Sequence, residues 1–331
     1  MIRIFHNTSY QFLKHWRLAA ILTALFIGLG LATYATTGAP NYSIEFTGGT
    51  MMQLQFKAKP DVAVMRATMD AAGITGAEIQ QFGTDLDYTI RAREESQVAQ
   101  QAKGAEGISK RIEAALTQKF GAGAVTVVRT EAVGPKVGSE LRSGAINAML
   151  LASLFTLIYL AIRFDWRFGL AAVLSTAHDI LVTLAFIKLL HVEVSLTVVA
   201  AILTLLGYSA NDTIIIFDRV RENLRKGRKG ESLAAVLDRS INETLPRSIM
   251  THATVLAATL ALLLVAGEVI QPFAVVMTFG VFVATFSSIY VAGPLLLYIE
   301  SRYPRAVTEA AGRAVRSGAE AAPAKARPAA R

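Results

Sequence analysis

The residues with the clearest capacity for chemistry are polar or ionisable side chains inside three long apolar stretches of this sequence. In chain order they are His178 and Asp179, then Tyr208, Asn211 and Asp212, and finally Arg247. A charged side chain at the centre of a bilayer costs about 2.5–3.5 kcal/mol on insertion scales, and residues kept there are usually functional. These positions therefore predict a working polar site inside a membrane.

Helical spacing groups these residues and their polar neighbours into stripes. The stripes are Ser175, Asp179 and Thr183; Thr204, Tyr208, Asn211 and Asp212; and Arg247, Thr251 and Thr254. Residues three or four apart lie on one face of a helix. Stripes on consecutive helices favour a shared polar interior, or a face that a partner covers, which is what a proton pathway needs.

Asp212 is the expected proton carrier. Burial disfavours the charged form of a carboxyl group, whereas a nearby guanidinium favours it. Asp212 is therefore expected to load and release a proton as Arg247 approaches or withdraws. The alternatives are static: an ion pair or interhelical hydrogen bonds at Asp212 and at His178-Asp179, and a basic anchor at the membrane boundary for Arg247.

Six apolar segments must position these residues. A helix needs roughly 20 apolar residues to cross the hydrocarbon layer, and residues 18–36, 145–162, 168–190, 194–217, 249–266 and 269–299 meet that requirement. The last segment is long enough to tilt, or to begin with an interfacial piece broken at Pro272. Basic residues flank the segments on one side only, so the positive-inside rule predicts cytoplasmic N- and C-termini. A cleavable signal peptide is the alternative for the first segment, although its apolar part is longer than usual.

Residues 38–140 contain no span and are expected to form one external domain. Strand patterns at residues 51–56, 77–82, 86–91 and 125–128 alternate with helical patterns at 61–72 and 94–120. The β-α-β-β-α-β order predicts a ferredoxin-like sandwich. The predicted fold class is a polytopic α-helical membrane protein with six transmembrane helices and one external ferredoxin-like α+β domain between spans one and two. The domain carries no catalytic constellation, which favours docking or contact with substrate.

The remaining segments lead to simpler expectations. Residues 1–37 are a cytoplasmic arm and the first transmembrane helix, 141–300 a five-helix transmembrane region with a basic cytoplasmic loop at 218–246, and 301–331 a disordered cytoplasmic tail. Residues 231–245 are expected to form an amphipathic helix on the inner membrane face, with Pro246 in the first turn of the next helix. The basic loop favours anionic lipid or an acidic partner, or serves orientation alone. Small residues predict a close-packing face on the sixth span, at Gly280, Ala284, Ser288 and Ala292.

Composition and motifs argue against several functional classes. The chain has no cysteine, which excludes disulfides, thiolate nucleophiles and cysteine-based metal sites. It contains no phosphate-binding loop, no H-E-x-x-H motif and no plausible nucleophile triad, so neither an enzyme nor a metal site is expected. Basic residues concentrate at membrane flanks, which argues against a nucleic-acid partner.

Several motifs resemble the SecD/SecF family of protein-export membrane proteins. The turn that contains Phe46, Gly48, Gly49 and Thr50 resembles the family's acidic-Phe-x-Gly-Gly-Thr signature. Residues 207–213 and 217–223 resemble the fourth-span signature of its SecF branch, while residues 178–179 and 247–251 resemble the third-span and fifth-span motifs. The resemblance covers about residues 1–300. It departs at residues 185–186, where a glycine is expected nearby, and at Pro246.

The resemblance implies membership of the resistance-nodulation-division superfamily and a multi-pass place in the bacterial inner (cytoplasmic) membrane. The implied partners are a SecD-like subunit, the Sec translocon channel and a translocating unfolded polypeptide, besides membrane lipid. The implied function is protein export driven by the proton motive force, without a cofactor, with Asp212 and Arg247 as coupling residues. The alternatives are half of a proton-driven exporter of small molecules or lipids, and a translocon scaffold that moves no protons.

Overall fold

The structure is a computed structural model that describes residues 8–92, 105–227, 231–267 and 269–304. It contains 6 helical segments long and apolar enough to cross a membrane. They are α1 (Trp16–Thr37, preceded by the 3-10 helix η1, Phe12–His15), α6 (Pro135–Arg163), α7 (Trp166–Leu189), α8 (Leu196–Lys226), α9 (Leu233–Val265), and α10 (Gln271–Tyr290) with α11 (Ala292–Arg302). The prediction of six transmembrane helices is confirmed.

The sixth span is interrupted, but not where the sequence suggested. Pro272 lies in the first turn of α10, and the break falls at Val291, between α10 and α11. Proline at a helix interior has no N–H to donate and its ring clashes with the carbonyl four residues earlier. Pro294 therefore conflicts with the carbonyl of Tyr290, which accounts for the break at the next residue.

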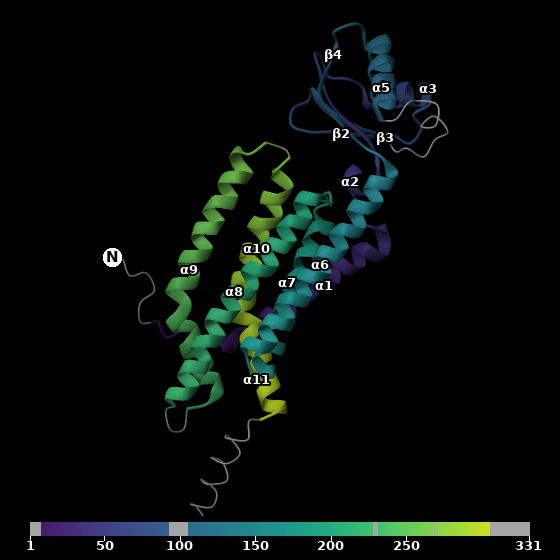
Figure 1. Ribbon diagram of the computed structural model, residues 1–331. Coiled ribbons are helices and arrows are strands. Elements are labelled where there is room, and N and C mark those ends of the chain that lie inside the picture. Colours follow the sequence, from purple (N-terminus) through teal and green to yellow (C-terminus); the bar gives the residue numbers. More distant parts are fainter. Residues whose placement is uncertain (1–7, 93–104, 228–230, 268, 305–331) are drawn as a thin grey trace, which may run out of the picture.

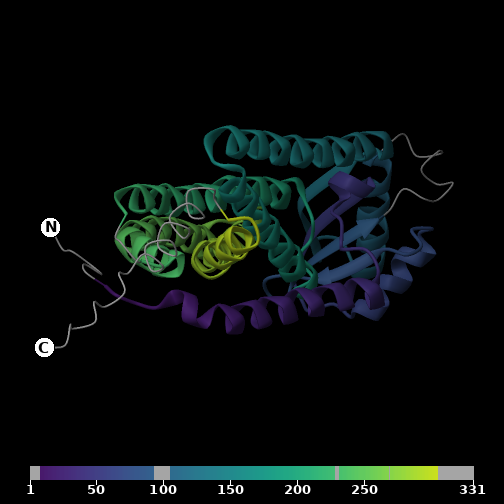
Figure 2. The same cartoon turned by 90° about the horizontal axis from the view of Figure 1, so that it is seen from below.

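The spans form an inner group and an outer group. In the most apolar part of each helix, 50% of residues in α7, 56% in α8 and 56% in α10–α11 are buried, against 11% in α1, 6% in α6 and 17% in α9. Figure 2 shows α1 and α6 on opposite sides of the inner helices. The outer helices thus leave most of their apolar surface for lipid or for another protein.

Small residues allow two close helix crossings. A Cβ atom at Gly30 of α1 would lie 2.7 Å from the Cα of Ala185 in α7. A Cβ atom at Gly280 of α10 would lie 2.7 Å from a methyl group of Leu205 in α8, which confirms the small residues of the sixth span as a packing face.

The chain between α1 and α6 forms a four-stranded antiparallel domain above the spans (Figure 1). Its elements are β1 (Gly49–Phe56), α3 (Val62–Ala71), β2 (Glu78–Gln81), β3 (Asp87–Ala92), α5 (Ala105–Phe120) and β4 (Val125–Val133), after a short helix α2 (Ile44–Thr47). The strand order β2-β3-β1-β4 confirms the predicted ferredoxin-like topology. The first part of the helix predicted at 94–120 lies outside the described residues.

The two faces of the sheet have different neighbours. Met52, Leu54 and Ile90 alternate onto one face, where they are almost fully buried in a cluster with residues of α3 and α5. The opposite face carries polar residues, including Arg91 of β3. It lines a cavity of about 470 Å³ together with Glu193 from the loop between α7 and α8. The domain is therefore seated on the ends of the inner spans at which α7 is joined to α8.

The expected amphipathic helix at 231–245 is not a separate helix. It is the first half of α9, which continues through Pro246. Its apolar residues, such as Leu237 and Ile241, are buried against Phe217 of α8 and Leu296 of α11. The apolar stripe is thus covered by protein, and Pro246 occupies the helix interior instead of the first turn.

The basic loop is largely neutralised by its own acidic residues. Arg219 pairs with Glu222 and Glu243, and Lys226 pairs with Glu222. These exposed pairs each contribute less than about 1 kcal/mol, but they remove most of the free positive charge from the described part of the loop. Residues 228–230 and the tail from 305 to 331, which was expected to be disordered, lie outside the described residues.

Candidate functional site

Asp179 is the centre of a buried polar cluster that joins three helices. Its side chain on α7 is 1% exposed. One carboxylate oxygen accepts hydrogen bonds from Ser209 of α8 at 2.5 Å and from Ser287 of α10 at 2.6 Å. The other oxygen lies 2.9 Å from Nδ1 of His178. Both oxygen atoms of this carboxyl group therefore have polar partners.

Asp212 lies in a second buried cluster, between α8 and α9. Its Oδ1 accepts a hydrogen bond from Ser248 at 2.7 Å. Its Oδ2 lies 4.0 Å from Nε2 of His252, and among the described residues neither atom has a hydrogen-bond partner. The ring of Tyr208 packs edge-to-face on the imidazole with centroids 5.1 Å apart. Two titratable groups thus face each other in a site closed to solvent.

Helix geometry explains why these clusters are adjacent. Ser209 and Asp212 are three residues apart on α8, and Ser248 and His252 are four apart on α9, so each pair shares one face of its helix. Asp212 is 4% exposed and His252 5% exposed. The two clusters are joined through α8, because Ser209 belongs to the first and Asp212 to the second.

The stripe predicted on α9 faces outward and not into the shared polar interior. Arg247 and Thr251 are exposed, whereas Ser248 and His252 point toward Asp212. In the described part of the chain, Arg247 forms no ion pair with Asp212. Successive helical residues are about 100° apart, so an offset of one residue moves the stripe to a different face.

The stripes predicted from helical periodicity omit four residues of the site, which are Ser209, Ser248, His252 and Ser287. Ser248 stands between the more conspicuous polar residues of its helix, and its spacing of four from His252 was the signal available. Ser287 stands next to the small-residue stripe of the sixth span and carries no charge. Its role depends on a contact with Asp179, 108 residues away in the sequence.

Asn211 lies on α8 but is exposed, as is Thr204. Together with Arg247, Thr251 and Thr254 of α9, they place polar groups on the outer surface of the transmembrane region. Polar groups are costly in contact with lipid tails. This outward polar surface, rather than the buried clusters, is the part of the predicted pathway that no described residue covers.

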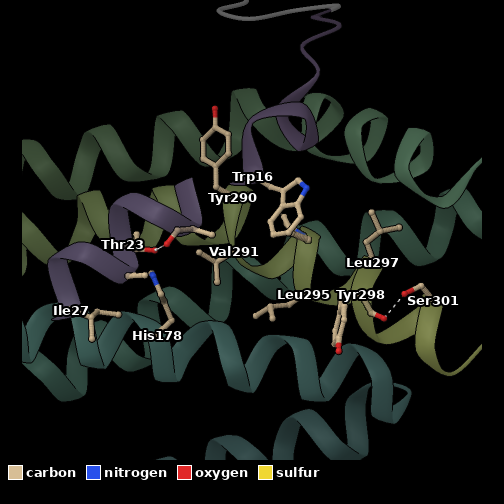
Figure 3. Close-up of a pocket in the computed structure, with 13 residues that line it drawn as sticks. Trp16, Thr23, Ile27, His178, Tyr290, Val291, Leu295, Leu297, Tyr298 and Ser301 are labelled. Carbon is tan, nitrogen blue, oxygen red and sulfur yellow. Dashed lines mark hydrogen bonds between the residues drawn. The ribbon is translucent and has the colours of Figure 1, made fainter. Parts of the chain in front are cut away.

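His178 connects the Asp179 cluster to a cavity. The cavity holds about 590 Å³ and lies between α1, α7 and the α10–α11 break. Figure 3 shows His178 reaching from α7 toward Thr23 and Ile27 of α1. The walls are mainly apolar, and His178 is one hydrogen bond away from the buried carboxyl group of Asp179.

The predicted signature turn forms the base of the α+β domain. Phe46 is buried in α2, Gly48 has a φ of +73°, and Gly49 and Thr50 begin β1. A Cβ atom at Gly48 would lie 2.9 Å from the Cα of Pro135, the first residue of α6. Both the positive φ and the close approach require glycine here, so this turn is a structural joint.

Burial perturbs the proton affinity of Glu193, a carboxyl group outside the spans. Glu193 lies in the loop between α7 and α8 and pairs with Arg91 of β3. Burial raises the pKa of Glu193, and the attraction of Arg91 offsets this only in part. Among the described residues, no group of three or more His, Asp or Glu side chains is arranged to hold a metal ion.

Family models match two parts of the chain. The model described as "Protein export membrane protein SecD/SecF, C-terminal" matches residues 112–302. The "SecD/SecF GG Motif" model matches residues 37–59, which include the signature turn. The matched regions thus contain both buried acids and the joint between the α+β domain and the spans.

Named relatives and solved structures agree with these models. The chain is 74% identical to "Protein translocase subunit SecF" of Gemmatimonas aurantiaca, over 96% of this chain and 95% of the relative. It is 39% identical to the protein of that name from Desulfurispirillum indicum, over 86% and 90%. The crystal structure of SecDF, a translocon-associated membrane protein from Thermus thermophilus, matches 91% of the chain with a TM-score of 0.78 and 34% identity.

The chain corresponds to 40% of that SecDF chain. A second crystal structure, of SecDF in a super-membrane-facing form, matches 97% of this chain and 41% of its own with a TM-score of 0.62 and 33% identity. Near-complete coverage of relatives named SecF, two family models and the shared fold lead to one conclusion: the chain is a multi-pass membrane protein that belongs to the SecF family of protein translocase subunits.

Proposed function

We propose that this chain couples inward proton movement to outward movement of unfolded polypeptides at the Sec translocon channel, together with a SecD-like subunit. The proton gradient is its energy source, and no cofactor takes part. The observation that carries the proposal is the buried pair of Asp212 and His252, with facing atoms 4.0 Å apart that lack other partners. A buried acid and base with unused hydrogen-bonding capacity suit proton transfer better than static packing.

The two buried acids differ in how fully their carboxylate oxygens are hydrogen-bonded. Asp179 accepts two hydroxyl hydrogen bonds and lies beside His178, so its polar atoms are engaged. Asp212 accepts one hydrogen bond, from Ser248, and its second oxygen is free to exchange partners. We therefore assign proton carriage to Asp212, and assign to Asp179 the task of holding α7, α8 and α10 together.

The energy gained when one charge crosses the membrane potential is comparable with the energy of a hydrogen bond to a charged group. Moving one charge through the membrane potential is worth about 2.3 kcal/mol per 100 mV. A hydrogen bond to a charged group contributes about 1.5–3 kcal/mol. Protonation of Asp212 therefore changes the strength of its contacts with Ser248 and His252 by a comparable amount, and these contacts join α8 to α9.

Arg247 and Asn211 point away from this pair, toward the outward polar surface of α8 and α9. An exposed arginine beside the apolar part of a span is favoured by a polar or acidic counterpart. The proposed SecD-like subunit supplies it, in keeping with a chain that corresponds to 40% of the solved SecDF. The proposed location is the bacterial inner membrane, with cytoplasmic termini, because the basic flanks lie at the end of the spans opposite the α+β domain.

The test is export of a secreted protein measured by pulse-chase in cells that carry Asp212→Asn. The matched control is Asp218→Asn, the same change on the same helix at an exposed ion pair with Arg163. We expect precursor to accumulate with the first variant as in a null strain, and export to proceed normally with the second. Normal export with Asp212→Asn, at equal membrane levels, would show that the carboxyl group is structural and leave a scaffold role.

A further inference from the structure

The loop between α7 and α8 is clasped by the segment that leads from α1 into the external domain. The backbone N–H of Ser43 donates to the carbonyl of Val194 at 2.9 Å, and the N–H of Val194 donates to the carbonyl of Asn41 at 2.7 Å. Below this bridge, Nζ of Lys188 donates to the carbonyls of Gly38 and Ala39 at 2.9 and 3.0 Å. The clasp therefore joins segments about 150 residues apart in sequence.

Glu45 extends the clasp to the first residue of α8. Its Oε2 accepts the backbone N–H of Leu196 at 2.7 Å and a hydrogen bond from the hydroxyl of Ser43 at 3.2 Å. The first N–H groups of a helix have no partner within the helix, and a carboxylate is favoured at this positive end. Ser195 caps the same turn by accepting from the N–H of Val198, so α8 is capped both from within and from the domain.

The close packing of the signature turn holds Glu45 in position. Glu45 belongs to the four-residue helix α2, which ends at Gly48. A Cβ atom at Gly138 of α6 would lie 2.9 Å from the backbone N of Gly48. The turn is thus held between α6 on one side and β1 on the other, and the carboxylate is presented to α8 from a rigid base.

We infer that Glu45 is a positioning residue that couples the external α+β domain to α8, the helix that carries Asp212. The consequence for transport rests on the proposed function. Leu196 and Asp212 are separated by about 24 Å of continuous helix, at about 1.5 Å per residue. A displacement of the domain is therefore transmitted along α8 and shifts Asp212 relative to Ser248 and His252, which belong to α9.

A second link acts at the same place. Arg91 of β3 pairs with Glu193 of the clasped loop, and the two side chains are 17% and 25% exposed. The pair ties the sheet itself, as well as the turn beneath it, to the end of α8. Coupling between two sites is reciprocal in its free energy, so a change at Asp212 also changes how firmly the domain is seated.

The absence of cysteine from the natural sequence allows a direct test. Tyr42 and Val194 form a parallel bridge, and neighbouring strands lie about 4.8 Å apart, within reach of a disulfide. In membranes of Tyr42→Cys/Val194→Cys, the rate of disulfide formation reports seating of the domain. We expect Glu45→Ala to lower that rate about tenfold, equal to about 1.4 kcal/mol, and Glu45→Gln, which keeps an acceptor, to lower it less. Asp70→Ala, an exposed acid on α3, is the control and should change it less than about twofold.

Measurements of protein export then distinguish a positioning role of Glu45 from a role in folding alone. Glu45→Ala should slow export, and completed oxidation of the cysteine pair in that background should restore it until reductant is added. Slow export that the disulfide does not restore, or an unchanged rate of disulfide formation, would overturn the inference. If Asp212→Asn blocks export while Glu45→Ala has no effect, the coupling fails and the proposed function stands. If Asp212→Asn exports normally while the Glu45 variant is rescued, the coupling stands and the proton role fails.

Discussion

Replacement of Ser287 by alanine tests the assignment of Asp179 as a structural hub. The variant removes one of the two hydroxyl groups that donate to the same carboxylate oxygen, while Ser209 and His178 remain in place. The perturbed volume is small and the site is fully buried. The cost should therefore come mainly from the lost hydrogen bond between α10 and α7.

The expected magnitude follows from the geometry. Hydrogen bonds between transmembrane helices average about 0.6 kcal/mol and reach about 1.7 kcal/mol, whereas bonds to charged groups contribute about 1.5–3 kcal/mol. The bond from Ser287 to Asp179 is 2.6 Å long and its carboxylate is 1% exposed. Its contribution should therefore lie at the overlap of these two ranges. We expect Ser287→Ala to lower the free energy of unfolding by about 1.5 kcal/mol. In an Asp179→Ala background it should cost almost nothing, because the acceptor is gone.

The assay is reversible unfolding in mixed micelles with a rising fraction of denaturing detergent, applied to both single variants and the double variant. Ser288→Ala is the matched control, because its hydroxyl is also buried but donates to the carbonyl of Thr285 in its own helix, not to a neighbouring helix within the described residues. It should change stability by less than about 0.5 kcal/mol. A coupling energy between Ser287 and Asp179 below about 0.5 kcal/mol would refute the hub.

Two further predictions concern helix packing and pH. Gly30→Ala places a methyl group against Ala185 and should cost about 1–3 kcal/mol through overpacking, seen as a lower melting temperature in detergent. Gly28→Ala, on the same helix with open space around it, should be neutral or stabilising. Equal melting temperatures for the two variants would contradict the close crossing of α1 and α7 at Gly30. Because burial raises the pKa of Glu193 above its usual 4.5, its contribution to stability is present below pH 4.5 and is lost as pH rises through the raised pKa. The pH dependence of melting in that window should therefore flatten in Glu193→Gln, and an unchanged profile would show that the group does not titrate there.

The sequence alone determined the membrane class, the number of spans and the topology of the domain. Those features depend on local patterns: runs of apolar residues long enough to cross a bilayer, alternation along strands, and glycine or proline at their ends. The buried acids were also identifiable, because Asp179 and Asp212 interrupt apolar runs. Each of these signals lies within one element and needs no knowledge of its neighbours.

Only the tertiary structure decided which residues meet. Periodicity shows which residues share a helical face, but the direction of that face depends on how the helix packs against others. Arg247 and Ser248 are adjacent in sequence, yet only Ser248 reaches Asp212. Long-range contacts carry no local signature, so the bonds from Ser287 to Asp179 and from Leu196 to Glu45 were invisible in the sequence. The partners of a buried acid are set by the packing of several helices together, and no single segment of the chain contains that information.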